Sequence, residues 1–224
     1  MEHEVLYRPS YSLVRIKLQR GEAVSAEAGA MVSMSSGIEM KTAAKGGILG
    51  ALKRSVLGGE SFFVNTFTAN EPGEVTFAPT LPGDIYAGQL AGQTLYAQSG
   101  AYIASSPEIQ VDTKWGGAKT FFSREGLFLL KLTGTGTVFL SSYGAIHEIE
   151  LAPGQTYIVD TGHMVAFEQS VKYGVKRVGG LKSTLFSGEG LVCELTGPGK
   201  IMIQSRSADA FLSWLIPQIP KRKD

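Results

Sequence analysis

Asp160 and His163 are residues whose types and spacing could do chemistry. A carboxylate near an imidazole can hold the ring in one orientation, and the ring can then act as a general base. The two residues stand three positions apart in the segment LAPGQTYIVDTGHMV at 151–165. A general-base site at these residues is therefore the first hypothesis for the chain.

Repetition within the chain argues against that hypothesis. The segment LQRGEAVSAEAGAMV at 18–32 matches 151–165 without a gap, and LAGQTLYAQSGAYI at 90–103 matches it with one deletion. We therefore expect Asp160 to support a turn and His163 to be a surface substitution, and we predict no catalytic residues. The residues at the two aligned positions are Glu27 and Ala30 in the first segment and Gln98 and Ala101 in the second.

The other residues that could bind a metal or act as a nucleophile are scattered. His147, Glu148 and Glu150 alternate between the two sides of one expected strand, and a chain with three histidines lacks the clustered ligands of a metal site. Cys193 lies in the apolar run LVCEL and is the one cysteine of the chain, so no internal disulfide can form. We expect a buried packing role for Cys193, and we predict no metal and no cofactor.

Positive charge is local in this sequence. Lys and Arg number 21 against 20 Asp and Glu, and the resulting net charge of +1 gives no overall field for nucleic acid. Basic residues beside Tyr173, or beside Trp115 in the insert at 112–120, could still bind single-stranded RNA through charge and stacking. RNA or small-ligand binding is therefore the alternative function, although the charge balance does not favour nucleic acid. The alternative polyanion patch is Lys172, Lys176, Arg177 and Lys182.

The insert KTAAKGGILGALKRSVLGGES at 41–61 predicts a docking segment. Apolar and cationic residues between its glycine pairs fit a short amphipathic helix, which could contact a membrane surface or a protein partner. The alternative is a loop or hairpin that folds over the β body or forms an oligomer contact. The predicted contact residues are Ile48, Leu49, Leu52, Lys53, Arg54 and Val56.

The inserts are connected to predicted strands that begin directly after glycine turns. The segments TANEPGEVTFAP (68–79), TGTGTVFLSS (133–142) and TGPGKIMIQS (196–205) are similar, and their glycines Gly73, Gly136 and Gly199 stand 63 residues apart. β formers follow each glycine, as expected for a strand that leaves a tight turn. Three such units with little helix predict an all-β barrel or prism with pseudo-threefold symmetry.

We predict a single domain of three repeats followed by a helical tail. The repeats span about 1–80, 81–143 and 144–206, and the tail spans 207–224. In the tail, Ser207 is suited to cap a short helix that ends near Pro217. Phe211, Trp214 and Leu215 would form its apolar face, which we expect to pack on the β body or on a neighbouring subunit.

Three motifs in order resemble a known family. They are KGGILGALKRSVLGGESFFVNTF (45–67), LAPGQTYIVDTGHMVAFE (151–168) and GEGLVCELTGPGKIMIQSR (188–206). Over nearly its whole length the chain resembles the mitochondrial biogenesis family named for altered inheritance of mitochondria, long described as a domain of unknown function. The resemblance implies a fold like that of the tryptophan RNA-binding attenuation protein, with three tandem copies of a short double-stranded β-helix. It implies no established activity.

The overall composition is that of a folded protein. The chain has 224 residues, of which 43% are hydrophobic and 18% charged, so its 28 glycines must belong to a packed fold. It has no run of 18 apolar residues and no signal-peptide pattern at its start, which predicts a cytoplasmic protein. The apolar segments at 48–57 and 211–216 favour burial in a homo-oligomer. We expect a non-enzymatic scaffold or binding protein that acts through oligomerisation and through insert contacts with a protein partner or a peripheral membrane surface.

Overall fold

The structure is a computed structural model that describes residues 1–43, 64–112, 128–177 and 191–220. The described residues form strands in several sheets, three short 3-10 helices and one short α-helix near the C-terminus. The predicted all-β class and the predicted C-terminal helix are therefore both confirmed.

The strands fall into three sets along the chain. The first set is β1 (Glu2–Leu6), β2 (Leu13–Leu18), β3 (Ala23–Glu27), β4 (Met31–Met34), β5 (Ile38–Ala43), β6 (Val64–Ala69) and β7 (Gly73–Phe77). The second is β8 (Ile85–Ala91), β9 (Leu95–Gln98), β10 (Tyr102–Ser105), β11 (Gln110–Asp112), β12 (Leu129–Thr133) and β13 (Thr135–Ser141). The third is β14 (Ile146–Leu151), β15 (Thr156–Asp160), β16 (Met164–Glu168), β17 (Lys172–Arg177), β18 (Leu191–Thr196) and β19 (Gly199–Gln204).

Each set pairs in the same way. In the first set β7 lies between β2 and β4, and β6 lies between β3 and β5. In the second set β13 lies between β8 and β10, and β12 lies between β9 and β11. In the third set β19 lies between β14 and β16, and β18 lies between β15 and β17. β1 is an addition that covers the free edge of β2.

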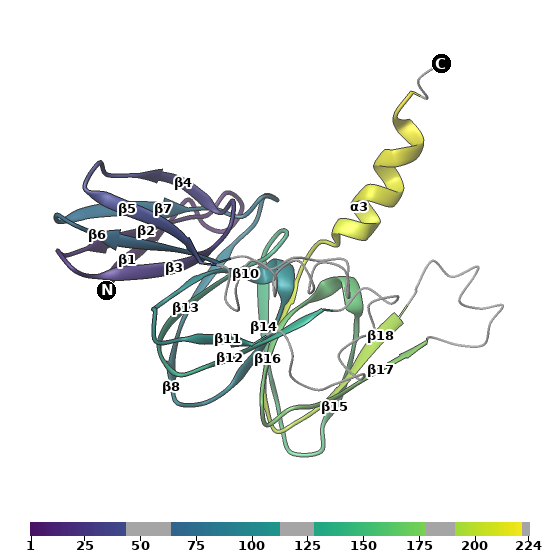
Figure 1. Ribbon diagram of the computed structural model, residues 1–224. Helices are drawn as coiled ribbons and strands as arrows, with labels where there is room; N and C mark the ends of the chain where they lie inside the picture. The colour runs from purple at the N-terminus through teal and green to yellow at the C-terminus, as the bar shows by residue number, and fades with distance from the viewer. Residues whose placement is uncertain (44–63, 113–127, 178–190, 221–224) are drawn as a thin grey trace.

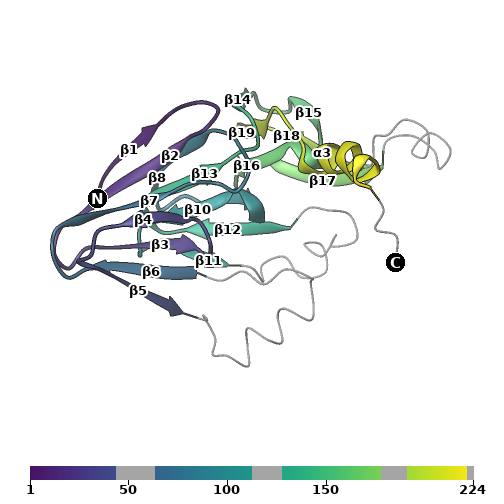
Figure 2. The same ribbon diagram turned by 90° about the horizontal axis from the view of Figure 1, so that it is seen from above.

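Neighbouring sets are joined by strand pairing. β3 pairs with β10, and β9 pairs with β16, so half of one set continues into half of the next. The result is four sheets in the orders β1-β2-β7-β4, β5-β6-β3-β10-β13-β8, β11-β12-β9-β16-β19-β14 and β15-β18-β17. Figure 1 shows these sheets following one another, with β4 towards one end of the molecule and β15 towards the other; Figure 2 agrees from above.

A hydrophobic core fills each of the three gaps between successive sheets. The first core includes Phe67 and Phe77, whose rings meet edge to face with centroids 5.2 Å apart. The second core contains Tyr102 and Leu130, and the third contains Phe167 and Cys193. The strands at the middle of the two central sheets, such as β10 and β16, are therefore buried on both faces, and this accounts for their nearly continuous apolar sequences.

Glycines occupy the same corner in each strand set. Gly21, Gly92 and Gly154 have φ angles of 85°, 96° and 79°, in the left-handed region that side chains with a Cβ rarely adopt. Gly21 lies in the turn between β2 and β3, Gly92 between β8 and β9, and Gly154 between β14 and β15. The glycines that align in the sequence therefore mark equivalent turns.

The helix α3 (Ala208–Leu215) begins where the sequence predicts. The Ser207 side chain accepts a hydrogen bond from the Ala210 backbone N–H at 3.4 Å, as an N-cap does. In the part of the chain that the structure describes, no helix is both long and apolar enough to cross a membrane.

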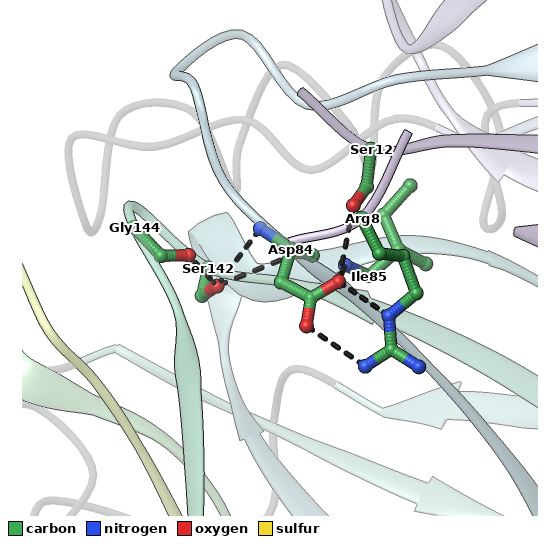
Figure 3. Close-up of polar contacts among 6 residues, drawn as sticks. All are labelled: Arg8, Ser12, Asp84, Ile85, Ser142 and Gly144. Carbon is green, nitrogen blue, oxygen red and sulfur yellow. Dashed lines mark hydrogen bonds and ion pairs between the residues drawn. The ribbon is translucent and has the colours of Figure 1, made fainter. Parts of the chain in front are cut away.

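A buried carboxylate fixes the segment before β8. Asp84, with 6% of its side chain exposed, accepts hydrogen bonds from Arg8 Nε and a second Arg8 nitrogen at 2.7 and 2.8 Å, and from Ser12 Oγ at 3.0 Å (Figure 3). The Ile85 N–H also donates to it at 2.8 Å. Burial alone would raise the pKa of Asp84, but these hydrogen bonds and the Arg8 charge hold its pKa below the ordinary value. The carboxylate thus ties the β1–β2 turn to the link between the first two strand sets.

We predict that Asp84→Asn lowers the free energy of unfolding by about 2 kcal/mol, because the Arg8 guanidinium loses a charged, bidentate acceptor. The folded pKa is depressed, so the stabilisation is complete above the unfolded pKa of about 4 and is lost as the pH falls through the lower folded value. Chemical denaturation of both proteins across pH should therefore show a gap that closes in acid. Glu4→Gln, which breaks an exposed pair with Arg15, is the matched control and should cost less than about 0.5 kcal/mol.

Candidate functional site

The structure separates Asp160 from His163 in function. The Asp160 carboxylate accepts a hydrogen bond from the Gly162 N–H at 2.8 Å and caps the 3-10 turn η3 (Thr161–His163). His163 Nδ1 lies 2.7 Å from the Gln204 carbonyl oxygen, so it carries the proton and donates. Each side chain serves a backbone group. The two do not form a carboxylate–imidazole pair.

No metal centre is found in the described ranges, where no group of three or more His, Cys, Asp or Glu could hold an ion. Glu148 forms an ion pair with Lys200 at 2.8 Å across β14 and β19. His147 is opposite Ile203 in the same pair of strands. These residues are part of the surface of a sheet.

A cleft of about 750 Å³ lies where the three strand sets meet. Among the described residues, its lining contains the carboxylates of Glu27 and Asp209 and no lysine, arginine, histidine or cysteine. The lining therefore offers no positive charge to a polyanion. It is built by equivalent turns from each set, together with the start of α3. The lining includes 27–30, 78–81, 100–103, 141–143, Gln98, Thr161, Gly162, Met164, Gln204, Ala208 and Asp209.

Polar groups in this cleft serve the fold. Gln204 receives a hydrogen bond from the Tyr143 N–H at 2.8 Å and donates one to the Gly162 carbonyl at 2.9 Å. Ser142 Oγ donates to the Gly144 carbonyl at 2.6 Å. These hydrogen bonds hold the turns that line the cleft together.

The polyanion patch predicted from the sequence is only partly described. Lys172 and Lys176 are exposed on the same face of β17, and Lys176 forms an ion pair with Glu194 on β18. That pairing reduces the charge available to a phosphate. Lys182 and the Arg177 side chain lie outside the described part, and so do Ile48, Leu49, Leu52, Lys53, Arg54 and Val56 of the predicted docking segment.

Strand β4 is an edge with uncovered apolar residues on both faces. Its counterparts β10 and β16 each have a second strand beside them, and their Ile103 and Val165 are 2% and 0% exposed. Val32, at the same bulge position of β4, is 55% exposed. Met31 and Met34 are exposed as well. β4 thus has the composition of an internal strand, and among the described strands none lies along its second edge.

Strand β15 is the complementary edge. Its counterparts β3 and β9 pair with β10 and β16, whereas β15 pairs only with β18 among the described strands. Tyr157 and Ile158 are 38% and 57% exposed, and Val159 beside them is buried in the third core. The two ends of the sheet series therefore present the two halves of a junction that the chain itself makes twice.

Sequence reasoning missed this site, although a signal for it existed. The aligned segments place Val32 and Val165 at the same position, so the first copy has the same apolar strand as the third. A tandem array whose strands pair from one copy to the next must leave one unpaired edge at each end. Only the pairing between copies, which the sequence does not display, identifies β4 and β15 as those edges.

Comparison with known proteins agrees with the resemblance found in the sequence. The family model described as mitochondrial biogenesis AIM24 matches residues 3–206. An uncharacterised protein of Streptococcus pyogenes is 29% identical over 218 residues, covering 94% of this chain and 88% of that protein. A crystal structure of a protein from Streptococcus pyogenes superposes with a TM-score of 0.81 at 29% identity, over 97% of this chain and 99% of the other. The family resemblance is confirmed.

Cys193 is predicted to be unreactive in the folded protein. It is buried in the third core, and burial, with a smaller contribution from the Asp160 charge, raises the pKa of its thiol to about 12. The reactive thiolate is therefore scarce at pH 8. A disulfide reagent such as Ellman's should label one thiol per chain in guanidinium and almost none in the native protein over the same time. Rapid stoichiometric labelling of native protein would instead indicate an accessible nucleophile.

Proposed function

The chain belongs to the mitochondrial biogenesis AIM24 family, and we propose that it acts there as a non-enzymatic scaffold that assembles from copies of itself. In this assembly β4 of one copy pairs with β15 of the next. The chain joins to its neighbour by the same kind of junction that joins β3 to β10 and β9 to β16.

The observation that carries this proposal is the contrast in exposure at equivalent positions. Met31 is 36% exposed, whereas its counterparts Tyr102 and Met164 are 0% and 2% exposed. Val32 differs from Ile103 and Val165 in the same way. Fully burying an exposed side chain of this kind contributes roughly 1.5–3 kcal/mol, and Met31, Val32 and Met34 are 36%, 55% and 40% exposed, so a partner that covers β4 gains a part of that amount from each.

The existing junctions also give a register for the contact. Ala104 is opposite Ala26 in one junction, and Ala166 is opposite Ala97 in the other. The corresponding residues at the free edges are Ser33 on β4 and Val159 on β15. One step further along the strands, Met34 of one copy should be opposite Ile158 of the next.

Such a contact is heterologous, because the two edges differ, so it generates either a closed ring or an open filament. We interpret the three strand sets as three tandem copies of a short double-stranded β-helix, at about 1–80, 81–143 and 144–206. Self-association by the free edges would continue that array from chain to chain. Arrays of this kind offer the same surface many times, which suits a scaffold.

The inserts supply the specific contacts in this proposal. The segment at 46–58 would meet a protein partner or a peripheral membrane surface, in a protein of the cytoplasm. Its support comes from the amphipathic sequence pattern around Leu49, Leu52 and Arg54.

The edge contact predicts a specific crosslink. Met34→Cys in one batch of protein and Ile158→Cys in another should give a covalent dimer when mixed with a short bismaleimide, because directly opposite residues bring their Cβ atoms within about 5.5 Å. The product is measured as a double-mass band. Met40→Cys, on exposed β5, replaces Met34→Cys in the control mixture and should give little dimer.

Light-scattering mass tests the assembly itself. Wild-type protein should have a mass of several chains, and Val32→Lys should reduce it toward one chain, because a charge would be buried in the junction. Tyr11→Lys, at a residue of the β1–β2 turn that is 74% exposed, should leave the mass unchanged. A wild-type mass equal to one chain would overturn self-assembly. An oligomer that resists Val32→Lys would overturn the edge contact alone.

A further inference from the structure

The C-terminal helix carries an apolar surface that its own described chain does not cover. No residue is buried in α3 or in the 3-10 turn η4 (Ile216–Gln218) that continues it. Leu212, Trp214, Ile216 and Ile219 are 46%, 64%, 61% and 56% exposed. At about 100° per residue, Trp214 lies on one side of the half-buried Phe211 and Leu215, and Leu212 and Ile216 lie on the other. We call the four exposed residues together the α3 face.

Described contacts hold the helix at its base. Ser207 caps it, and the Phe211 ring meets the Tyr143 ring edge to face with centroids 6.1 Å apart. The centroid of the Trp214 ring also lies 6.1 Å from that of Phe211. Figure 1 shows α3 projecting from the β body, with the C-terminus at its far end. A broad surface could therefore reach the α3 face without meeting the sheets.

Charge along this segment is distributed unevenly. In α3 and η4 the one charged residue is Asp209, in the first turn beside the body. The sequence after Pro220 is Lys221, Arg222, Lys223 and Asp224, which adds three positive side chains and one negative. The exposed apolar residues of α3 and η4 thus lie between Asp209, at the start of the helix, and a cationic sequence that follows Pro220.

We propose that the α3 face is a membrane-surface site that binds anionic phospholipid bilayers from the side, without spanning them. Tryptophan favours the level of the headgroups, aliphatic neighbours enter the acyl boundary, and nearby lysine and arginine attract anionic lipid. A second copy of this chain fits less well, because it would bring a second cationic end to the contact. The site is separate from the β4 and β15 edges and does not depend on the assembly proposed above.

Vesicle binding tests the site directly. Full-length protein should sediment with vesicles of phosphatidylcholine and phosphatidylglycerol and bind those of phosphatidylcholine alone more weakly, with the difference shrinking as salt rises. Trp214→Ser combined with Ile216→Ser should weaken binding about tenfold or more. In a Trp115→Phe background, Trp214 is the one tryptophan, and its fluorescence should shift to the blue when anionic vesicles are added.

Matched variants separate the outcomes. Tyr11→Ser removes an equally exposed aromatic residue from another surface and should bind like wild type. Unchanged sedimentation of the Trp214→Ser, Ile216→Ser protein would overturn the site and move any lipid contact elsewhere. A fall in light-scattering mass in the same variant would also overturn it, because the α3 face would then be a subunit contact. Loss of vesicle binding at unchanged mass is the expected result.

Discussion

Every β-strand has two edges whose backbone N–H and C=O groups need partners, and this requirement organises the molecule. β3 and β9 satisfy one edge within their own strand set and the other in the next set, through β10 and β16. That arrangement makes the two central sheets composite and buries both of their faces between successive cores. Every strand at the end of a described sheet has an open edge, but at β4 and β15 it is the edge that equivalent strands use to join neighbouring sets.

The sequence predicted much of this architecture, because local chemistry determines it. Gly21, Gly92 and Gly154 need positive φ, so the turns that they form recur visibly in the sequence. Alternating apolar residues report strands, and the helix cap is a local pattern around Ser207. Long-range pairing leaves no such mark: the sequence does not say that β3 meets β10 and not another strand, nor that Asp84 receives Arg8 from 76 positions away.

The same distinction explains what could be predicted of the candidate site. The repeats predicted that Asp160 supports a turn, because the equivalent positions carry Glu27 and Gln98, and the carboxylate indeed caps η3. They could not indicate that Val32 is exposed, because exposure depends on the neighbour that each strand receives. Val32, Ile103 and Val165 are chemically alike and differ only in what covers them.

The described chain leaves two kinds of apolar surface exposed, the β4 and β15 edges and the α3 face. The β4 and β15 edges lie towards opposite ends of the molecule, and α3 projects from the β body beside the third strand set (Figures 1 and 2). The base of α3 contacts η3, which directly follows β15, and its exposed apolar residues lie further along the chain. A single helix with four exposed apolar side chains binds a bilayer weakly. An assembly whose rotation brings several of these helices to the same side would bind the bilayer more tightly than one helix does. Each further helix then binds at an effective concentration that is set by the spacing between copies.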